Sequence, residues 1–312
     1  MSASALQKVI VSMLFDEHFR QKIYDQDPMI SHEFSLSHEE LLYLQKVDIR
    51  RWGIDTKRKD RMLEGILLFA HVSVSLWVEA GGSIHHLLDF FSSKTFHQSI
   101  QNRDFVAIAF LQWLSTQKPS TLSSSSQSQK QQRMQEYWQH TQAMIPLEIA
   151  CIPIHNKRVK TKTAFKITTD LIEQIATEQY TQLPQLKLAS HVTILSAPAS
   201  LISNYQKVRT YLSQNEQLHY TSAALYGVPE IALEKLSFHQ EVYLLLENST
   251  QGICMSEIPM GLAKLLQSCM NKNERSNLIP MIQILQQADF NYDEICDCLN
   301  GLLEDRLIQT CE

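Results

Sequence analysis

Residues 218–236, LHYTSAALYGVPEIALEKL, decide the fold that we predict for this chain. They read as two short strands, 220–226 and 228–236, that are joined by a tight turn at Gly227. Apolar side chains alternate with charged or small ones in the second strand, which is typical of a strand with one buried face. Pro229 offers no N–H to a ladder, so we expect this strand to lie at a sheet edge or to start there.

Helical patterns follow these strands, and the order is that of a winged helix-turn-helix. A capping box that begins at Ser237 predicts the first helix directly after the second strand. Residues 257–270 and 278–288 read as further helices, and residues 291–304 as the last one. Residues 306–310 are expected to return as a short strand, or wing.

The last helix is acidic, which bears on its partner. It carries Asp293, Glu294, Asp297 and Glu304, and it has no Lys or Arg. Phosphate neutralisation dominates DNA affinity, so this helix is a poor DNA reader. We therefore expect the groove beside it to bind something other than DNA, such as a peptide added along the strand edge.

The first half of the chain shows helical periodicity and no strand with a period of two. A capping box that joins Ser37 to Glu40 marks one helix start, and Gly81-Gly82 marks a helix end. Residues 191–195 and 199–212 later read as a strand and a helix. The predicted class is α+β, mostly α, in which an N-terminal helical part precedes a C-terminal winged helix-turn-helix with a small antiparallel sheet. The predicted helices of the first half cover residues 6–24, 37–52, 58–79, 84–91 and 104–114.

Changes in composition predict four consecutive segments. Residues 1–118 form a helical domain, and residues 119–133, which include TLSSSSQSQKQQ, form a Ser/Gln-rich linker. Residues 134–185 form a helical connector, and residues 186–312 form the winged-helix domain. A cluster of Lys and Arg between residues 157 and 166 reads either as a solvated loop or as a surface for an anionic partner.

The whole-chain totals narrow the class of protein. The 312 residues carry a formal net charge of −5, which argues mildly against nucleic acid or acidic membrane as a partner. Six cysteines lie along the chain without the spacing of a disulfide framework, which favours a reducing, cytoplasmic location. The first residues lack a signal-peptide pattern, and no apolar run reaches membrane-spanning length.

Sequence motifs for catalysis are missing. No G-x-S-x-G elbow or glycine-rich phosphate loop occurs, and His85-His86 point in different directions on a helix. A zinc site that draws on Cys254, Cys269, Cys296, Cys298 and Cys311 is conceivable, but the spacing does not match paired C-x-x-C knuckles. The sequence therefore favours a binding protein without a cofactor or metal of its own.

Three stretches carry a resemblance to a known family. They are LKLASHVTILSAPASLISNYQKVR (186–209), LHYTSAALYGVPEIALEKLSFHQEVYLLLENS (218–249) and LNGLLEDRLIQ (299–309). They resemble the partner proteins of multinuclear non-haem iron oxidative enzymes, which modify ribosomally made peptides as in methanobactin-type biosynthesis. Residues 83–114 and PLEIACIPIH (146–155) look like the helical half of such partners. Separately, FRQKIYDQDPMISHEFSLSHEELLYLQKVDIRRWGI (19–54) resembles the small helical fold of the extradiol dioxygenase alpha subunit, which also serves as an accessory domain.

The resemblance implies a non-catalytic subunit that pairs with an iron oxidase, and the iron belongs to that partner enzyme. It implies that a precursor-recognition element binds the leader of a ribosomal peptide and presents the core for modification. The leader would pair with the third strand and lie along the third helix. On this sequence the implied peptide-binding residues are Glu230, Ile231, Ala232, Leu233, Glu234 and Lys235 of the strand, and Tyr292, Asp293, Cys296, Asp297, Asn300 and Glu304 of the helix.

Two other functions stay open at the level of sequence. A DNA-binding transcriptional regulator with a helical sensor domain would share the winged-helix order, although the charge of the last helix disfavours it. An enzyme or metalloprotein would use the scattered His and Cys residues. We expect neither nucleic acid nor membrane as a partner.

Overall fold

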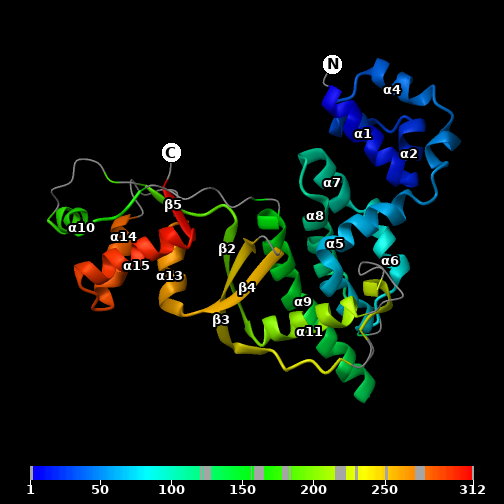
Figure 1. Ribbon diagram of the computed structural model, residues 1–312. Helices are drawn as coiled ribbons and strands as arrows, with labels where there is room; N and C mark the ends of the chain where they lie inside the picture. The colour runs from blue at the N-terminus through cyan, green and yellow to red at the C-terminus, as the bar shows by residue number, and fades with distance from the viewer. Residues whose placement is uncertain are drawn as a thin grey trace. The chain divides into compact units, whose positions relative to one another are not determined.

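The computed structural model describes residues 3–119, 122, 128–155, 157, 165–177, 183, 185–214, 223–228, 231–249, 252–270 and 278–310. The described residues are mostly helical, with one antiparallel sheet of three strands and one of two (Figure 1). The predicted class, α+β and mostly α, is therefore confirmed. The four-segment division is compared with the observed units below.

The chain divides into two compact units built from interleaved segments. Unit 1 consists of Met1–Ile149 and Asn204–Leu233, and unit 2 consists of Ala150–Ser203 and Glu234–Glu312. The four consecutive segments expected from the sequence do not coincide with this division. Helix α9 (Gln129–His155) begins inside the segment expected to be a linker, and it continues past Pro146 and Pro153.

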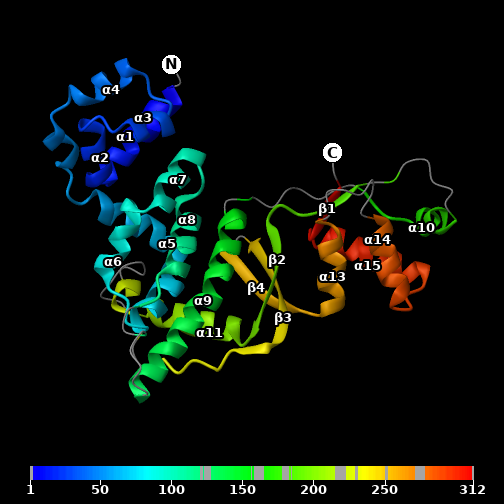
Figure 2. The ribbon, with the colours of Figure 1, turned by 180° about the vertical axis from the view of Figure 1, so that it is seen from behind.

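Unit 1 is helical throughout its described part, and in both views α7 and α8 lie beside α5 (Figures 1 and 2). The predicted helix 6–24 is interrupted because the Asp16 side chain caps a new helix start, accepting from the N–H groups of His18 and Phe19. Its elements are α1 (Ala3–Phe15), α2 (Glu17–Tyr24), α3 (Pro28–Glu33), α4 (His38–Gln45), η1 (Ile49–Gly53), α5 (Arg58–Glu79), α6 (Ile84–Leu88), η2 (Asp89–Ser92), α7 (Lys94–Asn102), α8 (Val106–Thr116), the first part of α9, η4 (Ala224–Tyr226), and the larger part of α11 (Leu201–Ser213).

Helix α5 has the predicted bounds but bends at Ala70, whose φ of −117° and ψ of 15° are not helical. At the bend the carboxylate of Glu148 accepts hydrogen bonds from the N–H groups of Val72 and Ser73, at 2.9 and 3.2 Å. An inserted side chain is one of the recognised causes of a sharp helix bend. Glu148 thus caps the second half of α5 from within the protein.

Helix α5 also belongs to the one described stretch that is long and apolar enough to cross a membrane, Ile49–Glu79. Most of its apolar window is buried inside the protein, and a core helix of a soluble protein passes the same test. Within α5, Leu67, Val72, Val74 and Leu76 have no exposed surface. The stretch therefore behaves here as a core helix.

Unit 2 contains both sheets. Strands β2 (Val192–Ala199), β3 (Ser237–Ser249) and β4 (Gly252–Ile258) form an antiparallel sheet in the order β2-β3-β4. Strands β1 (Leu186–Leu188) and β5 (Ile308–Thr310) pair with each other, so the expected strand at 306–310 is present. The strand expected at 191–195 is β2.

Four helices of unit 2 gather beside the sheets around an apolar cluster. Leu265 and Leu266 of α13, Met281 and Ile282 of α14, and Ile295 and Leu299 of α15 share it with Val192 and Leu245 of the sheet. In Figure 2, β1 lies close to α13 and α14. The four helices are α10 (Thr169–Ala176), α13 (Met260–Ser268), α14 (Leu278–Gln287) and α15 (Tyr292–Glu304).

The helix predicted after Ser237 is wrong, because residues 237–249 form strand β3. Leu244 and Leu246 are fully buried and Leu245 is almost so, although neighbouring residues of a strand point to opposite faces. Both faces of this strand are therefore covered. A continuous apolar run suits a buried strand as well as a buried helix, and periodicity does not separate the two. The helix predicted at 257–270 accordingly begins only at Met260.

The two strands predicted around Gly227 are also wrong. Residues 224–226 form the short helix η4, and residues 231–236 are extended without a strand partner, while 220–222 and 229–230 lie outside the described residues. Gly227 has a φ of 75°, and a Cβ there would lie 2.2 Å from a carboxylate oxygen of Glu79. The Glu79 side chain could move aside, so the glycine is required by its positive φ, which a side chain would strain, rather than by a hairpin.

Candidate functional site

Helix α15 starts where the sequence predicts. Asn291 is its N-cap and accepts from the N–H of Glu294 at 3.0 Å, while the Glu294 carboxylate accepts from the N–H of Asn291 at 2.8 Å. This reciprocal pair satisfies two backbone donors at the helix start. Ile295, Leu299 and Leu302 then turn one face of the helix into the apolar cluster of unit 2.

A second face of α15 is covered by residues 165–169, which we call the strap. The side-chain amide of Asn300 accepts from the N–H of Ile167 at 2.9 Å and donates to its carbonyl at 2.8 Å. The thiol of Cys296 donates to the same carbonyl at 3.0 Å. The hydroxyl of Thr169 donates to Asp293 at 3.0 Å. Three of the helix residues implied by the resemblance therefore contact the protein's own chain.

The remaining implied residues of α15 are open to solvent. Tyr292, Asp297 and Glu304, the other helix residues implied by the resemblance, are exposed. Asp297 and Glu304 are seven residues apart and so lie on the same side of the helix. The implied residue set thus divides into three residues that bond to the strap, of which Asp293 is itself exposed, and three exposed residues that do not.

The strand implied for peptide pairing, 230–235, does not form. Glu230 lies outside the described residues, and residues 231–235 have no ladder partner. The carbonyl of Ile231 accepts from the hydroxyl of Tyr137 at 3.4 Å, and the carboxylate of Glu234 accepts from the hydroxyl of Ser203 at 2.9 Å. Burial still alternates over Ile231, Ala232, Leu233 and Glu234, with Lys235 exposed, so the sequence pattern was real but belongs to an extended loop.

Strand β4 is one of the two edge strands of the three-stranded sheet, and β2 is the other. Strand β4 pairs with β3 on one side and with no described strand on the other. Unlike β2, which contains Pro198, β4 contains no proline. Each of its residues therefore carries an N–H for a ladder, and an extended peptide can pair with such an edge.

The hydrogen-bonding direction of β4 follows from one bond at the end of the sheet. The N–H of Asn248 donates to the carbonyl of His191, so Asn248 directs its backbone groups toward β2. Because successive residues of a strand alternate sides, Glu247 directs its backbone groups toward its register partner Cys254 on β4. It follows that Ile253, Met255 and Glu257 direct theirs to the open edge.

Unit 1 contains buried titratable groups that sequence reasoning missed. Burial raises the pKa of Glu148 to about 8, against the lowering effect of its hydrogen bonds to Ser73 and Val72. Burial lowers the pKa of His71 to about 3, and the positive charge of Arg209 lowers it further. Both side chains are therefore neutral near pH 7. For Glu148, the sequence signal of burial was its position as a lone acidic residue between Leu147 and Ile149 in an apolar run.

A Ser–His–Asp contact occurs near the N-terminus. The His97 ring lies 3.0 Å from the hydroxyl of Ser12 through Nδ1 and 2.8 Å from the carboxylate of Asp16 through Nε2. Ser12 has no exposed surface, so its oxygen cannot reach a substrate. Burial raises the pKa of Asp16, but the hydrogen bonds from His97 and Phe19 outweigh burial and hold it below its ordinary value.

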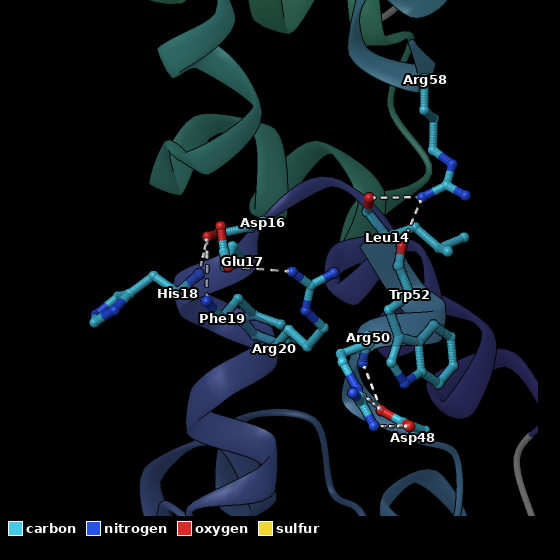
Figure 3. Close-up of polar contacts among 10 residues, drawn as sticks. All are labelled: Leu14, Asp16, Glu17, His18, Phe19, Arg20, Asp48, Arg50, Trp52 and Arg58. Atoms are coloured by element: carbon cyan, nitrogen blue, oxygen red, sulfur yellow. Dashed lines mark hydrogen bonds and ion pairs between the residues drawn. The ribbon is translucent and has the colours of Figure 1, made fainter. Parts of the chain in front are cut away.

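The surroundings of this contact show that it joins helices. In Figure 3 the Asp16 carboxylate receives the N–H groups of His18 and Phe19, at the start of α2. The guanidinium of Arg58 likewise donates to the carbonyls of Leu14 and Trp52, at 2.9 and 3.2 Å (Figure 3). These contacts fasten α1, α2, η1 and α5 to one another. We assign them a structural role.

Among the residues that the structure describes, no group of three or more His, Cys, Asp or Glu side chains is placed to hold a metal ion. Cys311 of the conceivable zinc set lies outside the described residues. Comparisons of the chain with protein-family models, with curated proteins and with solved structures found no match.

Proposed function

We propose that this protein is a non-catalytic partner subunit that binds the leader of a ribosomally synthesised precursor peptide. In this proposal it forms a cytoplasmic heterodimer with a multinuclear non-haem iron oxidative enzyme and presents the peptide core to it. The iron and the oxidative chemistry belong to the partner enzyme. The observation that carries the proposal is the open edge of β4 in a three-stranded sheet that three helices follow.

The order of elements supports a recognition element of the winged-helix kind. Strands β2, β3 and β4 are followed by α13, α14 and α15, so β4 is the third strand and α15 the third helix. The resemblance places the leader against the third strand and along the third helix. We therefore move the proposed pairing strand from residues 230–235 to β4 and keep α15.

The charge of α15 suggests what the leader carries. Asp297 and Glu304 are exposed on one side of this helix, and both described acids of its first turn, Asp293 and Glu294, are exposed as well. A leader with Lys or Arg opposite these groups would be attracted and oriented by them. The same charges repel nucleic acid phosphates.

A titration calorimetry experiment tests the binding. The ligand is a synthetic peptide with the sequence of the leader encoded beside this gene. Met255→Pro removes an N–H that faces the open edge while leaving the bonds between β3 and β4 in place, so we expect at least about tenfold weaker binding. Met255→Leu keeps the N–H and the side-chain size, and we expect it to bind as the wild type does.

The proposal fails if the wild-type protein does not bind the leader peptide, or if both Met255 variants bind it equally well. Circular dichroism of each variant establishes that the sheet is intact. A gel shift at low salt with promoter DNA from the same locus addresses the alternative of a transcriptional regulator, and a retarded band would favour that alternative.

The heterodimer is tested by co-purification. We expect the chain expressed alone to carry no stoichiometric iron, and the chain co-expressed with the neighbouring oxidase to elute as a stable complex that does. Metal analysis of both samples decides this. Stoichiometric iron in the chain purified alone contradicts the assignment of the metal to the partner.

A further inference from the structure

The strap on α15 is held mainly by its backbone. One carboxamide, that of Asn300, bonds both the N–H and the carbonyl of Ile167, and the Cys296 thiol adds a second bond to that carbonyl. Every non-proline residue of any peptide displays the same pair of groups. The notch formed by Asn300 and Cys296 therefore recognises an extended backbone, whatever chain supplies it.

The side chain beside this backbone contact defines the rest of the specificity. Ile167 has no exposed surface and belongs to the same buried cluster as Leu299 and Leu303. Its neighbours Lys166 and Thr168 are exposed. Ile167 enters the cluster and Phe165 packs partly against it, while Lys166 and Thr168 remain in water, which is how grooves take alternate side chains of an extended peptide.

We propose that this notch is a second recognition point for the leader, and that the protein's own Ile167 occupies it until a leader carrying an aliphatic residue replaces it. The inference rests on the proposed function. The strap then competes with the leader, and it gives the protein a closed and an open state. Leaders that lack an aliphatic residue at this position bind only along β4 and leave the strap closed.

The displacement needs to involve only a few residues. Helix α10, which continues the strap, is anchored by Ile172 and Ile175 in the same cluster and stays in place. Residues 165–168 have only the Ile167 side chain fully buried. A ligand's apparent affinity falls by the fraction of protein in the competent state, so weakening the strap strengthens leader binding.

Asn300→Asp tests the strap with little change in shape. The aspartate can still accept from the Ile167 N–H, but it cannot donate to the carbonyl and repels it. Because the leader would use the same amide, this variant weakens both occupants of the notch, so we expect no tightening of leader binding but at least about fivefold faster hydrogen exchange at residues 165–168 without leader. Gln283→Glu makes the same chemical change at an exposed position on α14 and is expected to bind as the wild type does.

Hydrogen exchange adds a direct readout on the wild-type protein. On addition of the leader peptide, we expect slower exchange at the β4 amides and at least about fivefold faster exchange at residues 165–168. Ile167→Ala weakens the strap and leaves the side chains of the notch unchanged, so it should tighten leader binding by at least about fivefold. It keeps the test meaningful if Asn300→Asp does not fold.

The outcomes separate the two proposals. If the leader protects β4 while strap exchange in the wild type and the leader affinity of Ile167→Ala both stay unchanged, the strap inference is overturned and the proposed function stands. If the leader protects neither region and no variant binds it, the proposed function is overturned and the strap inference with it.

Discussion

The two units bury different chemistry. The described core cluster of unit 2 consists of aliphatic side chains, methionine and cysteine, including Ile295, Leu299 and Ile308. Unit 1 buries a carboxylic acid, Glu148, and an imidazole, His71, beside its apolar side chains. Burial shifts the pKa values of these two groups in opposite directions. Unit 2 also buries an imidazole, His191, whose pKa burial lowers, but its described residues include no buried carboxylic acid. The difference implies that unit 1 loses stability as pH rises above neutrality, whereas the stability of unit 2 changes little between pH 6.5 and pH 8.

The largest effect is expected from opening a cavity in unit 2. Leu299→Ala removes a fully buried side chain of α15 and should lower the free energy of unfolding by about 3 kcal/mol, within the usual range of about 2–5 kcal/mol. Because the site contains no titratable partner, we expect the same loss at pH 6.5 and pH 8. Urea unfolding followed by circular dichroism measures it. A loss of stability that changes strongly with pH would contradict the view that packing alone sets the cost of this substitution.

A smaller effect that depends on pH is expected in unit 1. The folded pKa of Glu148, about 8, lies above its ordinary value of 4.5, so its contribution is fully present below pH 4.5 and is lost as pH rises through 8. Glu148→Gln cannot titrate and can accept only one of the two backbone N–H groups. We expect it to be less stable than wild type by about 1–2 kcal/mol at pH 6.5.

That deficit should shrink between pH 6.5 and pH 9, because only the wild-type protein then pays for ionising a buried acid. The interval starts at pH 6.5 because His71, with a folded pKa of about 3 and an ordinary pKa of 6.5, hardly titrates above pH 6.5. Unfolding curves at four pH values give the slope. A constant deficit would show that Glu148 is already ionised in the fold.

The smallest expected effects come from a matched pair of helix caps, one in each unit. Ser37 and Glu40 form a capping box at α4, and Asn291 and Glu294 form one at α15. Ser37→Ala and Asn291→Ala should each cost about 1 kcal/mol, because each leaves a helix N–H without its side-chain acceptor. Differential scanning calorimetry resolves which unfolding transition moves. Each substitution should shift a different transition, and a shift of both by either variant would mean that the units unfold together.

Local signals in the sequence predicted the helices well. Helix α5 has the predicted bounds, and the capping box predicted at Ser37 is present, whereas the one predicted at Ser237 is wrong because that residue begins strand β3. Caps and helical periodicity involve residues within one or two turns, so they can be read from a short window. The class of fold followed from them.

Tertiary context decided what the sequence could not. Strand β3 was predicted as a helix because its apolar run, Leu244–Leu246, is buried on both faces. The strap was not foreseen because the bond between Ile167 and Asn300 joins residues 133 positions apart. The edge strand β4, to which we move the proposed pairing site, exists because β3 and β4 form a hairpin where the sequence predicted a helix. The strand or helix propensity of a segment predicts its structure only weakly where contacts with distant residues favour the other structure.

The interleaving of the two units has a consequence for how the chain is made. Unit 1 needs residues 204–233, and these follow the whole first segment of unit 2 in the chain. A ribosome therefore releases the whole of α5, α8 and much of β2 before it supplies the last piece of the first unit. No single cut of the chain separates the two units either. A fragment that ends before residue 233 lacks part of unit 1, and a fragment that starts after residue 149 lacks most of unit 1.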